Sequence, residues 1–242
     1  MTARRQVLGD DHPDTLWSMN NLAVTRRDLG DLLGARDLLE QTLAAFRRVL
    51  GDDHPDTLNS MNNLADTLRD IGDSHGARQL LEQALTISKR VLGDDHPHTL
   101  WSMYGLAETN RTLGDLDGAR QLHEQALAGY RRVLGDDHPD TLWSMNSVGL
   151  TRQALGDLQG AHDLLEQAVS DFRRVRGEDH PDTLTCMSSL AMTRRALGDL
   201  PGARDLHEQA LAGRRRVLGD DHSDTLTSMN NLTQVRRELG EQ

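Results

Sequence analysis

The residues best suited to chemistry in this sequence are histidines and acidic residues that recur in short turns. Six histidines lie 42 residues apart, each directly after a Gly-Asp-Asp or Gly-Glu-Asp sequence: His12, His54, His96, His138, His180 and His222. Carboxylate and imidazole groups bind divalent metal ions, and histidines can also form a pH switch. One histidine and two carboxylates in a tight turn rarely converge on one point, however. Helix capping and loop packing explain these turns better, and we expect no metal site.

The sequence carries none of the common catalytic motifs. A phosphate-binding Walker loop needs a Gly-Lys pair, but the only lysine, Lys89, follows Ser88. Gly-x-Ser-x-Gly, His-Glu-x-x-His and Cys-x-x-Cys are absent as well. The single cysteine, Cys186, lies beside Met187 in a helical pattern, and we interpret it as a core residue. Because an active site needs a singular constellation of side chains, we expect neither enzymatic activity nor a cofactor.

The histidine turns mark an internal repeat of 42 residues. Each histidine is followed by proline, or by Ser223 in the last copy, and then by Asp-Thr-Leu or, in the third copy, by His98-Thr99-Leu100. A fixed period of this length is the signature of a repeat architecture. No low-complexity linker interrupts the copies, so we expect residues 1–242 to form a single array.

Each repeat contains two amphipathic helical patterns. Pro13 suits the first turn of the first helix, and Gly30 and Gly51 are placed to end the two helices. First helices are predicted to start near residues 14, 56, 98, 140, 182 and 224, and second helices near 32, 74, 116, 158 and 200. This register predicts five full units over about residues 14–218, an N-terminal helix remnant over 1–8 and an unpaired last helix over 224–239.

A helix pair of this kind cannot bury its apolar face alone, so neighbouring units must stack into an all-α solenoid of antiparallel helix pairs. The residues at helix-packing spacings in the first unit are Leu22, Ala23, Gly30, Ala35, Leu39 and Leu43. In these spacings the unit resembles the tetratricopeptide repeat. Its length, its His-Pro-Asp opening and the string Asn20-Asn21-Leu22-Ala23 are most similar to the repeats of the kinesin light chain. Long bacterial arrays, often joined to a signalling nucleotidase, are similar too.

The resemblance implies a right-handed superhelix whose first helices line a concave groove. Residues one turn off the packing stripe are then expected to point into that groove. The peptide-binding residues that the resemblance implies are Asn20, Asn21, Asn62, Asn63, Tyr104, Asn146, Asn230, Arg27, Arg69, Arg111, Arg195, Trp17, Trp101 and Trp143.

The chemistry of these residue types suits a peptide. Asparagine amides donate to and accept from an extended backbone, arginine offers forked donors to carboxylates, and tryptophan is common at interface hot spots. The alternative is that the asparagines satisfy neighbouring helices, that the arginines form a solvated face and that the tryptophans pack between units. For the tryptophans the two interpretations are equally favoured.

One position departs from the family pattern. Where the family often has an aromatic residue, this chain has Arg26, Leu68, Asn110, Arg152, Arg194 and Arg236. At a half-buried position these arginines must either extend their heads into solvent or pair with carboxylates. We favour packed stems with solvated heads over a buried ladder of ion pairs.

Composition narrows the partners and the compartment. The net charge of −11 argues against nucleic acid and anionic membranes, and no apolar run approaches the roughly 20 residues of a membrane span. A single cysteine fits a reducing cytoplasm. Lys89 is the only lysine among 27 basic residues, which favours a GC-rich bacterial source.

The leading hypothesis is therefore a scaffold that binds proteins or peptides, and the alternative is a regulatory or sensor segment of a larger bacterial signalling protein. The last predicted helix lacks a covering partner, which suggests a homo-oligomer through uncapped ends. The alternative explanation is that the chain is a fragment of a longer array.

Overall fold

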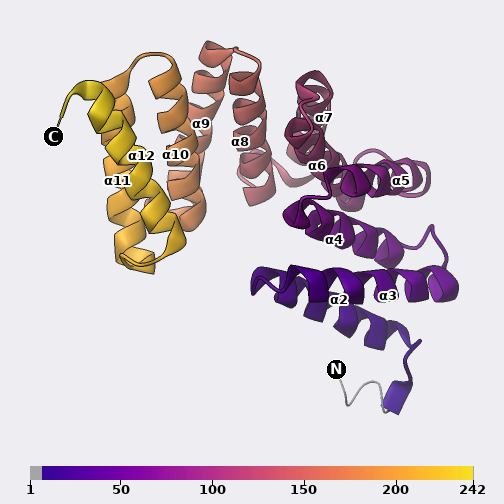
Figure 1. The fold of residues 1–242 in the computed structure, drawn as a ribbon. Helices are drawn as coiled ribbons and strands as arrows, with labels where there is room; N and C mark the ends of the chain where they lie inside the picture. Colours follow the sequence, from indigo (N-terminus) through magenta and orange to yellow (C-terminus); the bar gives the residue numbers. More distant parts are fainter. Residues whose placement is uncertain (1–6, 242) are drawn as a thin grey trace. The chain divides into compact units, whose positions relative to one another are not determined.

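Residues 7–241 are described by a computed structural model, in which they form helices joined by short turns, with no strand in that range (Figure 1). Two units can be distinguished, with their boundary between Gly129 and Tyr130. The helices that begin in the first unit are α2 (Pro13–Asp28), α3 (Leu32–Leu50), α4 (Pro55–Ile71), α5 (Ser74–Leu92), α6 (Pro97–Thr112) and α7 (Leu116–Leu134). Those of the second unit are α8 (Pro139–Ala154), α9 (Leu158–Arg176), α10 (Pro181–Ala196), α11 (Leu200–Leu218) and α12 (Ser223–Leu239).

These bounds agree closely with the sequence analysis. First helices begin one residue before the predicted starts, and second helices begin at the predicted residues. The all-α prediction is confirmed. Of the predicted N-terminal remnant, Val7 and Leu8 are helical, whereas residues 1–6 lie outside the described residues. Among residues 7–241, no helix combines the length and the apolar character that crossing a bilayer would require.

Helices pack in two layers within each unit. In the first unit, α3 packs against α2 and α4, and α5 packs against α4 and α6, so each second helix sits between two first helices. The first helices also touch one another, α2 against α4 and α4 against α6. In the second unit α9 and α11 alternate with α8, α10 and α12 in the same way. The predicted stacking of helix pairs is thus present within each unit.

The apolar core is shared between successive pairs. One cluster in the first unit joins Leu39 and Leu43 of α3 to Leu58 and Met61 of α4 and Ala84 of α5. Leu39, Leu58 and Met61 are fully buried. Since the cluster takes side chains from two consecutive pairs, neither pair would bury it alone.

The recurring histidines cap the first helices. In all six turns the histidine Nδ1 accepts a hydrogen bond from the backbone N–H two residues later, with a donor–acceptor distance of 3.2 Å. This satisfies one of the backbone donors that a helix N-terminus leaves unpaired. The capping interpretation is therefore confirmed. In the described part of the chain, no three His, Cys, Asp or Glu side chains gather where they could hold a metal ion.

In several turns the two acidic residues before the histidine hold the turn to helices on either side. Asp52 lies 2.9 Å from Arg47 in the helix before it, and Asp53 accepts a bond of 2.5 Å from Arg90 in the next second helix. The second type of contact recurs between Asp11 and Arg48, Asp137 and Arg174, and Asp179 and Arg216. Each exposed pair contributes little by itself, but together they fix the turn geometry.

The second helices are capped by aspartate. Asp31 Oδ1 accepts from the backbone N–H of Gly34 at 3.0 Å. A Cβ on Gly34 would lie 2.3 Å from Asp31 Oδ2, so the capping carboxylate occupies the space of a side chain. This close approach explains why glycine follows the cap at that spacing.

The histidine cap can be tested at His54. Replacing His54 by Ala removes the acceptor for the Asp56 N–H and is expected to lower the free energy of unfolding by about 1 kcal/mol. His54→Asn restores an acceptor and should keep most of this stability. Urea unfolding followed by circular dichroism measures both variants. Equal losses in the two would contradict the capping role.

Candidate functional site

The predicted site residues lie on one face of the first helices. Residues three or four apart share a helix face, which places Trp17, Asn20, Asn21 and Arg27 along α2. Because α2, α4 and α6 are adjacent, the matching positions of the three helices form rows across the first unit. The structure thus brings most of the predicted residues of each unit onto one layer.

The tryptophans are both packed and partly exposed. Trp17 packs against the cluster that contains the buried Phe46. In the second unit the rings of Trp143 and Phe172 meet edge to face, with their centroids 5.8 Å apart. Trp17, Trp101 and Trp143 each remain half-buried. Packing therefore accounts for one side of Trp17 and Trp143 and leaves the other side accessible.

The asparagines divide into buried and accessible groups. Asn20, Asn62 and Asn146 are 3%, 1% and 3% exposed. Asn62 Oδ1 accepts a hydrogen bond of 2.9 Å from Ser102 Oγ on the next first helix. All three side chains are buried and cannot reach a ligand without rearrangement.

The second asparagine row behaves differently. Asn21 is exposed. Asn230, in the second unit, shares the register of Asn20 but is exposed as well. Asn63 is buried and donates from Nδ2 to Asn59 Oδ1 at 2.8 Å. This bond orients the half-buried Asn59, a residue outside the predicted set.

The arginine row is paired with carboxylates that the sequence analysis did not identify. Arg27 lies 3.8 Å from Asp66 and 3.7 Å from Asp70 on the next first helix. Arg69 lies 3.1 Å from Asp66. Burial raises the pKa of Asp66, an effect that Arg69 and Arg27 partly offset. In the second unit Arg195 binds both carboxylate oxygens of Glu238.

The arginines that depart from the family pattern fit neither predicted alternative fully. Arg194 lies 3.2 Å from Glu166, and Arg236 lies 2.7 Å from Glu208. Their side chains are 26% and 45% exposed, respectively. The heads are thus partly solvated, as expected, yet each also pairs with an acid on a second helix.

A buried polar cluster in the first unit was missed by sequence reasoning. His123 occupies the repeat position of Leu39 and Leu81, and it is fully buried. Its Nε2 lies 3.2 Å from Glu108 Oε1, and its ring lies near that of Tyr104. Burial by itself would raise the pKa of Glu108, but hydrogen bonds from His123 and Arg111 outweigh it and lower that pKa to about 2. A histidine at a leucine position of the repeat was the available signal.

The second unit has a histidine in the same register but with different neighbours. His207 is buried, and burial together with the charges of Arg214 and Arg195 lowers its pKa to about 4. Arg214 stands where three earlier repeats have Phe46, Tyr130 and Phe172, and it is 7% exposed. Its guanidinium donates to Thr185 and Ser188 hydroxyls, each at 3.3 Å. Here an arginine and a threonine stand where Phe172 and Trp143 meet in the preceding repeat.

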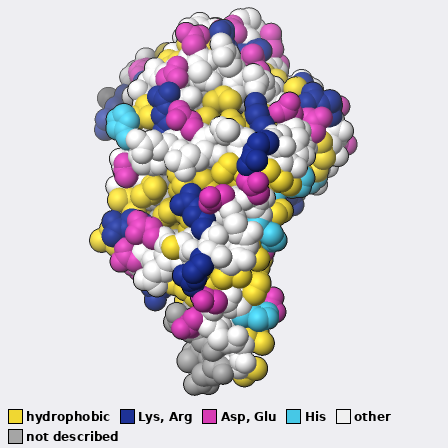
Figure 2. Space-filling view, turned by 90° about the vertical axis from the view of Figure 1, so that its right-hand side faces the viewer, with side chains coloured by type: hydrophobic (Ala, Val, Ile, Leu, Met, Phe, Trp, Pro, Cys, Tyr) yellow, Lys and Arg dark blue, Asp and Glu magenta, His cyan; other side chains and the backbone are white. Residues whose placement is uncertain are grey.

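Surface charge is mixed rather than segregated. Figure 2 shows basic and acidic side chains next to one another on the face it displays, with hydrophobic side chains between them. This arrangement agrees with the many ion pairs described above. A uniformly basic face of the kind that binds nucleic acid is not visible in that view.

Comparison with known proteins gives consistent matches. A tetratricopeptide-repeat model matches residues 1–47, 22–90, 68–132 and 111–172, and a second one matches residues 183–224. The crystal structure of a putative kinesin light chain with nearly identical TPR-like repeats from Podosopora anserina is 32% identical, with a TM-score of 0.71. That alignment covers 86% of this chain and 98% of the other.

Two more distant structures share the fold. BtubC (BKLC) from P. vanneervenii is 21% identical, with a TM-score of 0.69 over 84% of this chain and 85% of its own. A Rap protein complexed with Competence and Sporulation Factor is 13% identical, with a TM-score of 0.71 over 93% of this chain and 64% of its own. A search of the curated proteins gave no match.

The difference between the two buried histidines leads to a pH prediction. The pKa of His207 is about 4 in the folded chain against an ordinary 6.5, so the unfolded state takes up a proton first as the pH falls. Stability is therefore expected to decline between about pH 6.5 and pH 4. His207→Leu should remove this decline, on the order of 1–3 kcal/mol, in urea unfolding measured across that range.

The same substitution at His123 is expected to lower the stability of the folded chain. His123→Leu takes a hydrogen-bond partner from the largely buried Glu108 and is expected to cost about 1–3 kcal/mol at neutral pH. The two variants place leucine at equivalent repeat positions and so control for each other. If both changed stability alike at pH 7, Glu108 would not be the cause of the difference.

Proposed function

The chain belongs to the tetratricopeptide-repeat family, and on that premise we propose that it is a protein-interaction scaffold that holds an extended peptide along its first helices. Arrays of this family are generally interaction scaffolds without catalysis. The Rap protein of similar fold was solved with Competence and Sporulation Factor bound, which supports the idea that such a helix array can hold a partner.

One observation carries the proposal: accessible side chains on the first-helix layer are held in place by contacts with buried residues. Trp17 rests on the cluster of Phe46, and Asn59 is held by the amide of the buried Asn63. Side chains that are already ordered lose less conformational entropy on binding. With Asn21, Trp101 and Tyr104 they form the proposed contact surface of the first unit. In the second unit we assign Trp143, Arg195 and Asn230 to the corresponding surface.

Charges on this surface define the ligand further. Asp70 and Arg111 are its more exposed ionic groups, with 43% and 38% of their side chains accessible. Arg27 and Arg69 are less exposed and are paired with Asp66. A peptide with both acidic and basic side chains suits this arrangement better than one of a single sign.

The buried asparagines have a supporting role in this proposal. Asn62 joins α4 to the next first helix, and we assign the buried Asn20 and Asn146 the same role of supporting the accessible residues. Their replacement would disturb packing as well as binding, because Asn62 bonds with Ser102. They are therefore poor choices for a binding test.

A sharper test uses accessible residues. A peptide library displayed on phage is selected against the full chain, and the affinity of a selected peptide is measured by fluorescence polarisation. Asn59→Asp keeps the acceptor for Asn63 but removes the amide donor, and Trp17→Ala removes the apolar surface. Each is expected to weaken binding about tenfold or more.

Arg120→Ala provides the matched control. Arg120 is an exposed residue of α7 whose ion pair is with Asp117 of the same helix, so this variant should bind as the parent does. Unfolding curves verify that all variants are folded. Unchanged affinity in both Asn59→Asp and Trp17→Ala would refute the proposed surface.

A further inference from the structure

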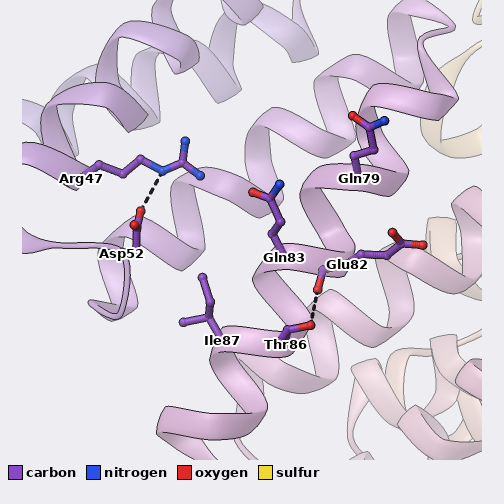
Figure 3. Close-up of a pocket in the computed structure, with 7 residues that line it drawn as sticks. All are labelled: Arg47, Asp52, Gln79, Glu82, Gln83, Thr86 and Ile87. Carbon is purple, nitrogen blue, oxygen red and sulfur yellow. Dashed lines mark hydrogen bonds and ion pairs between the residues drawn. The ribbon is translucent and has the colours of Figure 1, made fainter.

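The second-helix layer of the first unit contains a groove between α3 and α5. Two adjoining hollows of about 450 and 320 Å³ lie there and share Arg47, Gln79 and Gln83. Figure 3 shows side chains from both helices around the larger hollow, with Arg47 on one side and Gln83 and Ile87 on the other. Apolar side chains from α4, including Leu64 and Leu68, line the smaller hollow.

Two residues make this groove different from its counterparts in the repeat. Leu68 stands where other repeats have arginine or asparagine, and Ile87 stands where they have alanine, glycine or aspartate. Both are partly buried against the core cluster of the first unit. Two apolar residues that no other repeat has at these positions, Leu68 and Ile87, thus line the same groove.

Arg47 lies at one side of the groove, where it is paired with an acid of the following turn. Its Nε lies 2.9 Å from Asp52, the first acid of the following turn. The same contact recurs at 3.9 Å between Lys89 and Asp94, at 3.1 Å between Arg131 and Asp136, and at 2.7 Å between Arg215 and Asp220. In these turns an aspartate thus draws the cation toward the loop.

The equivalent groove of the second unit is occupied by the chain's own arginine. Glu178 replaces the aspartate there, and among the described contacts none joins it to Arg173. Arg173 instead crosses from α9 to α11 and donates from Nη2 to Gln209 Oε1 at 2.9 Å. The guanidinium also lies 3.7 Å from the sulfur of Met187. The hollow that remains is only about 160 Å³.

Gln83 is the counterpart of Gln209, and no described contact places Arg47 on it. We propose that the groove between α3 and α5 is a second docking site, which takes an arginine side chain from a partner protein. The stem of that arginine would lie along Ile87 and Leu68, and its guanidinium would donate to Gln83 Oε1, as Arg173 donates to Gln209. Glu82 lies in the lining and accepts a bond of 2.9 Å from Arg78 of the same helix through Oε1. The net charge of −11 favours a cationic guest.

The test uses the full chain, labelled with ¹⁵N, and three short acetylated peptides that differ only in a central arginine, lysine or citrulline. The arginine peptide is expected to shift the side-chain amide signals of Gln79 and Gln83 and the backbone signal of Ile87 in a saturable way. Lysine lacks the planar fork and citrulline lacks the charge, so both should bind about tenfold more weakly. Equal shifts with citrulline, or no shifts at these residues, would overturn the proposal.

Matched variants separate the groove from general attraction to an acidic protein. Gln83→Leu removes the acceptor, and Asp52→Glu copies the turn of the second unit and should release Arg47 into the groove. Both are expected to lose the shifts at Ile87, whereas Asp220→Glu, the same change in a distant turn, should keep them. Persistence of the shifts in Gln83→Leu would refute the site. Trp17→Ala should still bind the arginine peptide, because this site does not depend on the first-helix surface.

Discussion

The structure depends on one constraint: a pair of amphipathic helices exposes too much apolar surface to be stable alone. The cluster that joins Leu39 of α3, Met61 of α4 and Ala84 of α5 shows how the constraint is met, because both helices of the second pair complete the core of the first. Burial of such side chains provides most of the driving force for folding. The histidine caps and the paired turns then set where each helix begins, so the stack repeats in register.

A constant register lets single residues change the chemistry of a site without changing the fold. Leucine, histidine and leucine again fill the position of Leu81, His123 and Leu165, and all are buried. The His123 ring forms a hydrogen bond with the carboxylate of Glu108. His207 instead lies near Arg214 and Arg195, and burial together with their charges lowers the pKa of His207 to about 4. The same repeat position thus places a histidine beside a carboxylate of the preceding helix in one repeat and beside two arginines in another.

The two layers differ in how they present side chains. In the first unit the first helices touch one another, so matching aromatic, amide and ionic side chains lie in rows across them. Between α3 and α5 the second-helix layer instead leaves hollows with an apolar floor from α4. In the turn after α3, Asp52 holds Arg47 at one side of this groove, whereas in the second unit Arg173 crosses the corresponding groove to Gln209. Asp52 and Glu178 differ by one methylene group, and the groove is open beside the first and filled by Arg173 beside the second.

The sequence by itself determined the fold class, the helix bounds and the capping role of the histidines, because these follow from short-range periodicity and from contacts within a few residues. The partners of each side chain were decided by the tertiary structure. Spacing placed Asn20 and Asn21 on the same layer, but only packing against the next first helix buried one and left the other exposed. Arg47 and Arg173 differ locally in the acid five residues later, Asp52 or Glu178. Only the tertiary structure brings Gln209 of α11 and Met187 of α10 within reach of Arg173, because these contacts join different helices.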